Sequence, residues 1–226
     1  GGPNKLLQPI GGKPMVRHVV EAALGSRASP VVVVLGHQQH EVRQALRGLK
    51  VHMVHNPDFA EGLSTSLKAG LAALPETVDG AVVCLGDMPR VSATLIDRLI
   101  AAYSPIEGRG IVVPIWHGKR GNPVLWGRSF FHEMHEVAGD VGARHLIGRH
   151  ADAVAEVDAG DDAALEISTM MISGTVTSEP AAMIDAYGYS NALGPEKRAM
   201  ATVTGSVAVV ESWRASMNSF QVVMNA

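Results

Sequence analysis

Residues 80–89 read GAVVCLGDMP and place one acidic side chain, Asp87, directly after an apolar run. The run 80–85 is typical of a buried strand, and a helical pattern begins near Ser92. Open α/β sheets bind ligands at the carboxyl ends of their strands, where this carboxylate would lie. Because Mg²⁺ is usually held by one or two carboxylates together with substrate phosphates, Asp87 is a candidate Mg²⁺ ligand. A turn-forming aspartate is the alternative interpretation.

The same change from strand to helix recurs along most of the chain. Apolar, β-branched runs predict buried strands, and apolar residues at spacings of three and four predict the helices between them. This alternation indicates an α/β fold in which helices cover both faces of a mostly parallel sheet. Strands are expected at 30–36, 51–54, 80–85, 110–114 and 153–157, and helices at 14–24, 38–46, 64–74, 92–103 and 141–148.

Composition excludes several classes of protein. The chain has 226 residues, of which 46% are hydrophobic and 18% charged, enough for one large domain with a buried core. A net charge of −3 argues against nucleic acid or a membrane surface as a partner, and no apolar run reaches the length of about 18 residues that spans a bilayer. The single cysteine, Cys84, precludes an intrachain disulfide and favours a cytoplasmic location.

Three further segments offer groups that bind phosphates or a nucleoside. The ammonium group of Lys5, near a glycine-rich start, suits a triphosphate, and a solvated surface lysine is the alternative. Residues 62–67 read GLSTSL and begin a helix, whose free N–H groups suit an anion or the edge of a base. Capping of this helix by Ser64 is the other interpretation. Asn56 precedes a proline, so it suits either a nucleoside contact or a turn.

A basic segment at 119–123 reads KRGNP. The guanidinium group of Arg120 is suited to a phosphate on a second substrate, because its N–H donors form a fork. A hairpin turn with solvated charges is the alternative interpretation.

Taken in order, these segments resemble the MobA-like nucleotidyltransferases, most closely the molybdenum cofactor cytidylyltransferases. The resemblance implies a Rossmann-like, three-layer α/β/α domain of the nucleotide-diphospho-sugar transferase type. It covers residues 1–165 and rests on NKLL at 4–7, GGKP at 11–14, HNP at 55–57, GLSTSL at 62–67, LGDMP at 85–89, GNPVL at 121–125 and GDVGAR at 139–144.

The resemblance also implies a reaction: transfer of CMP from CTP to the molybdopterin cofactor, with release of pyrophosphate and with Mg²⁺ as cofactor. By this resemblance Lys5 and Asp87 are the catalytic residues, with Lys5 on the triphosphate and Asp87 on the metal ion. Nucleotide contacts are expected from Lys5, Asn56, Gly62, Ser64, Ser66 and Leu67, and acceptor contacts from Arg120, Gly121, Asn122 and Pro123.

Other functions remain open. A relative that uses GTP or another nucleoside triphosphate, a sugar-phosphate nucleotidyltransferase, and a non-catalytic module that holds the molybdenum cofactor as a chaperone are the alternatives. A molybdoenzyme or its chaperone is the expected recipient of the product. Nucleic acid and membranes are not expected partners.

Both ends of the chain depart from the family pattern. The family begins with a strand and a Leu-Ala-Ala-Gly-x-Ser-x-Arg-Met loop around the triphosphate, and this chain starts after that loop. Near Ser168 the family pattern Asp-Ile-Asp-Thr-Pro is replaced by Glu-Ile-Ser-Thr. We therefore divide the chain into a nucleotidyltransferase domain at 1–165, without its first strand and triphosphate loop, and a tail at 166–226. We hypothesise that a reading-frame shift near residue 166 produced the tail, which coding DNA without a family-like alternative frame would refute.

Overall fold

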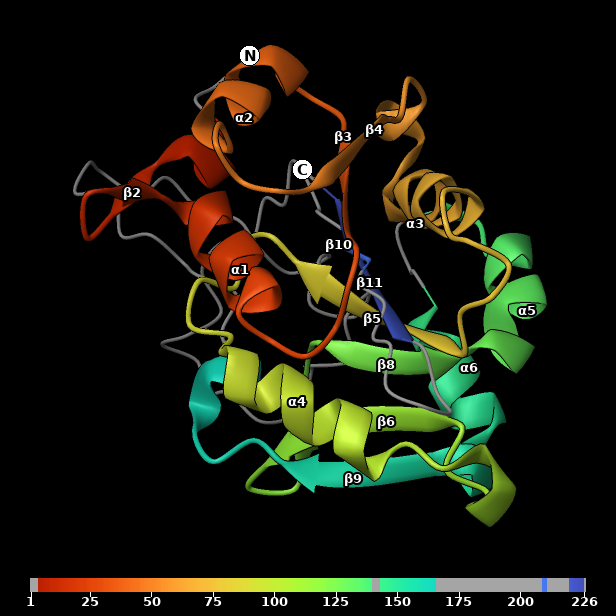
Figure 1. Cartoon of the computed structure of the whole chain (residues 1–226). Coiled ribbons are helices and arrows are strands. Elements are labelled where there is room, and N and C mark those ends of the chain that lie inside the picture. The colour runs from red at the N-terminus through yellow and green to blue at the C-terminus, as the bar shows by residue number, and fades with distance from the viewer. Residues whose placement is uncertain (1–3, 140–142, 166–208, 211–219, 226) are drawn as a thin grey trace, which may run out of the picture.

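A mixed sheet of nine strands runs through the computed structural model, which describes residues 4–139, 143–165, 209–210 and 220–225 (Figure 1). A separate two-stranded hairpin precedes it. The hairpin consists of β1 (Pro9–Ile10) and β2 (Lys13–Pro14), and the sheet of β3 (Val31–Leu35), β4 (His52–His55), β5 (Gly80–Leu85), β6 (Ile111–Trp116), β7 (Lys119–Arg120), β8 (Val124–Gly127), β9 (Val154–Asp158), β10 (Val209–Val210) and β11 (Phe220–Asn225).

Most strands of the large sheet point in one direction. Strands β3, β4, β11 and β5 are parallel to one another, and β6 and β9 form a second parallel pair. Because β8 is antiparallel to both β5 and β6, all six of these strands share one direction, whereas β7, β8 and β10 run against it. The mostly parallel sheet predicted from the sequence is confirmed, and the carboxyl ends of β3, β5 and β6 lie at one edge.

Helices cover both faces of this sheet, as the alternating pattern predicts. Buried side chains of α1, α2 and α4 pack against one face, and those of α3, α5 and α6 pack against the other. The fold is therefore a three-layer α/β/α sandwich (Figure 1). The helices are α1 (Met15–Leu24), α2 (Gln39–Ala45), α3 (Leu63–Ala72), α4 (Ala93–Ala102), α5 (Phe131–Glu136) and α6 (Arg144–Arg149).

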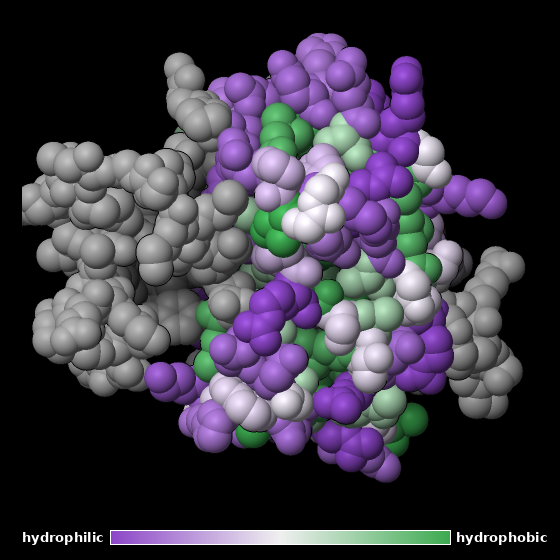
Figure 2. Space-filling model, turned by 90° about the vertical axis from the view of Figure 1, so that its left-hand side faces the viewer, coloured by the Kyte–Doolittle hydropathy of each residue, from purple (hydrophilic) through white to green (hydrophobic). Residues whose placement is uncertain are grey.

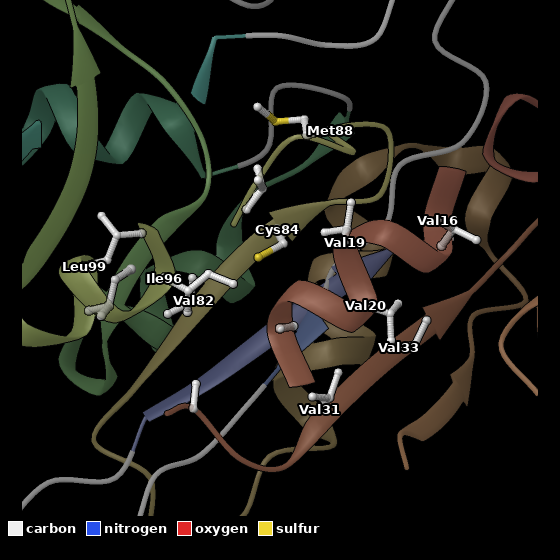
Figure 3. Close-up of a cluster of buried hydrophobic side chains, with 14 of the residues drawn as sticks. Val16, Val19, Val20, Val31, Val33, Val82, Cys84, Met88, Ile96 and Leu99 are labelled. Atoms are coloured by element: carbon white, nitrogen blue, oxygen red, sulfur yellow. The ribbon is translucent and has the colours of Figure 1, made fainter. Parts of the chain in front are cut away.

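The first core forms where α1 and α4 pack on the centre of the sheet. Val16, Val19 and Val20 recur at helical spacing along α1, and all three are buried. Figure 3 shows Val20 beside Val33 of β3, Val19 beside Cys84 of β5, and Ile96 of α4 beside Val82 of β5. Helix α1 forms because its apolar residues make one stripe that the sheet buries. Strand β3 forms because it is apolar on both faces and both faces are covered.

The outward sides of the helices are largely polar. On the face shown in Figure 2, hydrophilic side chains predominate over the upper part, and hydrophobic side chains lie in separate groups among them. Among the residues that the structure describes, no helix is long and apolar enough to cross a membrane.

Strands β7 and β8 and helix α5 were not predicted from the sequence. Strand β8 follows the segment 119–123 directly, where the sequence predicted only a loop. The turn lies instead at His117 and Gly118, both with positive φ, so that Lys119 and Arg120 form the short strand β7. Helix α5 was also not predicted, because only Met134 of its six residues is fully buried and its apolar pattern is short.

Strand β11 occupies the centre of the sheet, between β3 and β5, and is parallel to both. Its Val222 pairs with Val31 on one side and Val82 on the other, and Asn225 pairs with Val34 and Leu85. The predicted tail at 166–226 therefore contributes a central strand. Other parts of that tail lie outside the described residues, as does Ser168.

We expect Val222→Pro to destabilise the protein by about 2 kcal/mol or more, because proline removes a backbone donor from a strand that is paired on both sides. Urea unfolding would measure the change. Val222→Ile, which keeps the backbone N–H, is the matched control. Equal unfolding midpoints for the proline and isoleucine variants would show that β11 does not contribute to the stability of the sheet.

Candidate active site

Asp87 lies two residues beyond the end of β5, next to Lys5. Its carboxylate oxygen Oδ2 is 3.6 Å from Nζ of Lys5, and the Asp87 side chain is only 6% exposed whereas that of Lys5 is 31% exposed. Residues that stand far apart in the sequence thus meet at the carboxyl edge of the sheet. The two residues that the family resemblance implies to be catalytic are therefore neighbours in the structure.

The charge of Asp87 is incompletely compensated. Burial raises the pKa of its carboxyl group above the usual value, and the ammonium group of Lys5 only partly offsets this effect. A buried carboxylate of this kind fits a divalent cation, which would supply the missing positive charge. No group of three or more His, Cys, Asp or Glu side chains suited to a metal occurs among the described residues, so phosphate oxygens would have to complete the coordination.

Lys5 is held in place by the residue before it. The side-chain oxygen of Asn4 accepts a hydrogen bond from the backbone N–H of Leu6 at 3.0 Å and so caps the short 3₁₀ helix η1 (Lys5–Leu7). The amide nitrogen of Asn4 donates to the carbonyl oxygen of His37, which follows β3, at 3.4 Å. Asn4 is buried, so this turn is anchored at the edge of the sheet.

The start of α3 is tied to the end of β4 through Asn56. The amide nitrogen of Asn56 donates to the hydroxyl oxygens of Thr65 and Ser66, each at 2.9 Å, and its side-chain oxygen accepts from the backbone of Asp58 at 3.0 Å. Asn56 and Ser66 are almost fully buried. The amide of Asn56 therefore orients the first turn of α3.

Ser64 does not cap this helix, and the capping interpretation was wrong. Helix α3 begins at Leu63 after Gly62, which has φ 108° and ψ 179° and makes no side-chain cap. Ser64 lies inside the first turn and is buried. No side chain caps the first turn of α3, and within that turn the backbone N–H of Thr65 donates to the carbonyl oxygen of Gly62 at 3.3 Å.

A cavity of about 210 Å³ opens between α3, β5, β8 and α6. Its walls are mostly apolar and include Trp126 of β8, Met134 of α5 and Ile147 of α6. Polar groups come from Arg120, Asn122 and Arg144. The other lining residues are Leu63, Leu67, Val83, Leu85, Gly121, Val124, Ala143 and Gly148.

The cavity joins two sets of predicted residues. Leu67 from the nucleotide set and Arg120, Gly121 and Asn122 from the acceptor set all line it, and Leu85 lies two residues before Asp87. Pro123, Asn56, Gly62, Ser64 and Ser66 do not line the cavity.

Trp126, Met134 and Ile147 were missed as site residues. Trp126 and Met134 lie on β8 and α5, which were not predicted. Ile147 lies on a helix that was predicted, but no site residue was expected on that helix. Arg144 was predicted only as part of the family segment 139–144. A basic residue near the start of a helix is a signal that could have indicated a site residue there.

The loop between β7 and β8 lies tightly against η7 (Asp162–Ala164). The backbone N–H of Asn122 donates to the carbonyl oxygen of Ala164 at 2.9 Å, and that of Gly121 donates to Pro114 at 2.8 Å. A Cβ atom at Gly121 would collide with the carbonyl oxygen of Ala164. Glycine is therefore required for this close approach.

Comparison with known proteins identifies the family. The profile described as "MobA-like NTP transferase domain" matches residues 1–154. The chain belongs to this family. Its resemblance to MobA-like nucleotidyltransferases is thus confirmed, whereas the closer likeness to the cytidylyltransferases stays a prediction.

Individual relatives agree with this assignment. The chain is 35% identical over 126 residues to the bifunctional protein GlmU of Kineococcus radiotolerans, a match that covers 55% of this chain and 25% of the relative. It therefore spans about a quarter of that relative's length. Among solved structures, a homologue of Mycobacterium tuberculosis rv0371c from Mycobacterium sp. strain JC1 aligns with TM-score 0.61 and 27% identity, over 70% of this chain and 79% of the other.

A second solved structure is described as a manganese complex of Rv0371C from M. tuberculosis H37Rv. It aligns with TM-score 0.60 and 25% identity, and the alignment covers 68% of this chain and 80% of that one. These likenesses confirm the predicted fold class.

We expect Asp87→Asn to stabilise the protein at neutral pH. Because the folded-state pKa of Asp87 is raised, the folded protein binds this proton more tightly than the unfolded chain, and stability falls as pH rises from about 4 through the raised pKa. Asparagine removes this loss, which is about 1.4 kcal/mol for each unit of pKa shift. Urea unfolding between pH 4 and pH 8 measures it; the difference should vanish at the acidic end, and a less stable variant at pH 8 would contradict the expectation.

Gly121→Ala is expected to destabilise the protein by about 1–3 kcal/mol, because the new methyl group must displace the backbone of Ala164. Gly148→Ala is the matched control. Position 148 also lines the cavity, but a Cβ there meets no atom within 4 Å, and alanine favours a helix by about 0.5–1 kcal/mol. Equal thermal unfolding midpoints for the two variants would show that the close approach of Gly121 to Ala164 does not limit the side chain at position 121.

Proposed function

We propose that this chain transfers a nucleoside monophosphate from a nucleoside triphosphate to an acceptor, specifically CMP from CTP to the molybdopterin cofactor. The observation that carries the proposal is the buried Asp87 carboxylate, 3.6 Å from Lys5 at the carboxyl edge of the sheet, in a chain of the MobA-like family. One buried acidic group beside one cation suits the binding of a metal–triphosphate complex.

In the proposed reaction Lys5 and Asp87 act on the triphosphate. The ammonium group of Lys5 would donate hydrogen bonds to phosphate oxygens, and Asp87 would hold Mg²⁺. The bound ion would supply neutralisation of phosphate charge. The manganese complex of the related mycobacterial protein supports a divalent cation in this fold.

The nucleoside would lie at the first turn of α3. The positive end of the helix dipole lies there, and Asn56 fixes the orientation of this turn through Thr65 and Ser66. We propose that Asn56, Ser64, Ser66 and Leu67 shape this subsite. Asn56 would act there chiefly by fixing the helix start, since its amide already bonds to Thr65 and Ser66.

The acceptor would occupy the cavity. Its apolar walls and Trp126 suit a flat ring system, and Arg120, Asn122 and Arg144 suit a phosphate and ring heteroatoms. Because the walls are mostly apolar, the several hydroxyl groups of a sugar would find few polar partners there. This chemistry favours a pterin-type acceptor over a sugar phosphate.

The chemical step would be an in-line displacement. An oxygen of the acceptor's terminal phosphate attacks the α-phosphorus and forms a new P–O bond, while the bond to the bridging oxygen of the β-phosphate breaks and pyrophosphate leaves. The step needs no protein nucleophile, because positioning and charge neutralisation lower its barrier.

A sugar-phosphate acceptor is the second candidate, and the similarity to GlmU favours it. Pyrophosphate release from CTP, GTP and UTP, measured with either molybdopterin or a hexose 1-phosphate present, separates the two. A non-catalytic cofactor-binding module would release no pyrophosphate with any pair.

We expect release with CTP and molybdopterin, and a loss of at least about a hundredfold in Asp87→Asn and about tenfold in Lys5→Ala. Lys13→Ala is the control, because the Lys13 ammonium is paired with Glu21 at 2.7 Å. Undiminished release by Asp87→Asn would refute the proposed role of this carboxylate.

A further inference from the structure

Arg144, the first residue of α6, reaches the loop between β7 and β8. Its guanidinium Nη2 donates a hydrogen bond to the carbonyl oxygen of Arg120 at 3.2 Å. Both arginines line the cavity. Arg144 therefore joins α6 to the loop that carries Asn122.

The loop itself has little freedom. The Arg120 side chain is fixed from β9 by Glu156, whose Oε1 accepts from Nε at 2.7 Å. The backbone N–H groups of Gly121 and Asn122 are bonded to Pro114 and Ala164. The bond from Arg144 completes this set at the carbonyl group of Arg120.

We propose that Arg144 is a positioning residue for the acceptor. It holds the carbonyl group of Arg120, and thereby fixes the position of the loop whose Asn122 lines the cavity. The inference deepens the proposed function and rests on it for the identity of the acceptor. Neither Lys5 nor Asp87 is among the residues that line the cavity, so we expect the triphosphate to bind independently of Arg144.

Arginine suits this role better than lysine. A guanidinium group presents its donors in one rigid plane, so it can fix the direction of its hydrogen bond to the carbonyl oxygen of Arg120. Lysine at this position keeps the charge but not the planar fork. The conservative variant therefore separates the effect of charge from that of geometry.

A purely structural role for Arg144 would give a different pattern. If Arg144 served only to attach α6 to the sheet, its loss would lower stability and weaken both substrates alike. Arg149 provides the matched control, because it lies on the same helix, forms an ion pair with Glu133 at 3.3 Å, and is not among the residues that line the cavity.

The test uses the full chain and pterin-6-carboxylate, a fluorescent ligand that is flat and anionic. We expect Arg144→Ala to weaken its binding about tenfold or more, Arg144→Lys to weaken it less, and Arg149→Ala to leave it unchanged. In steady-state pyrophosphate release, Arg144→Ala should raise KM for the acceptor and leave KM for CTP unchanged. Circular dichroism and urea unfolding verify that each variant is folded.

Several results would overturn the inference. These are equal binding of pterin-6-carboxylate by Arg144→Ala and the unchanged chain, no binding by the unchanged chain, or a parallel rise in KM for CTP. If Arg144→Ala does not fold, the comparison of Arg144→Lys with Arg149→Ala decides. Arg144-dependent binding without any pyrophosphate release would refute the proposed function while leaving the inference intact.

Discussion

Parallel alignment of β3, β11, β5 and β6 is the constraint on which the site depends. It brings the carboxyl ends of these strands to one edge, so that Asp87 after β5 lies within reach of the turn at Asn4 and Lys5. Asn4 bonds to His37 beyond β3, and Lys5 contacts Asp87 beyond β5. The turn therefore connects the carboxyl ends of β3 and β5, the two strands between which β11 lies.

Two apolar cores on opposite faces stabilise this arrangement. Leu35 and Cys84 contribute to the core under α1 and α4, whereas Val34 and Trp126 contribute to the core under α3, α5 and α6. Because both faces of these strands are covered by helices, their apolar side chains are removed from water in both directions. Asp87 is buried at the end of such a strand, where low exposure raises its pKa and makes a cation favourable.

The sequence predicts most of the parallel strands, but it predicts neither the central strand β11 nor the antiparallel strand β8. Strand β5 and helices α1 and α4 follow from apolar periodicity. The helical pattern predicted to begin near Ser92 does so, and the hydroxyl group of Ser92 accepts from the backbone N–H of Leu95 at 3.2 Å. Strand β8 was not predicted, because its four residues follow a Gly-Asn-Pro segment that resembles a turn. Ser64 did not cap α3, because the helix begins at Leu63 and Ser64 therefore lies inside its first turn.

By itself the sequence determined the fold class, the order of the main elements and the ionisable residues at the strand ends, because periodicity and composition are local properties. Its segments also identified the family. Only the tertiary structure decided that Lys5 pairs with Asp87, that β11 lies between β3 and β5, and that Trp126, Met134 and Arg144 share one cavity. These are contacts between residues far apart in the chain, which form when helices and strands pack and which no local pattern specifies.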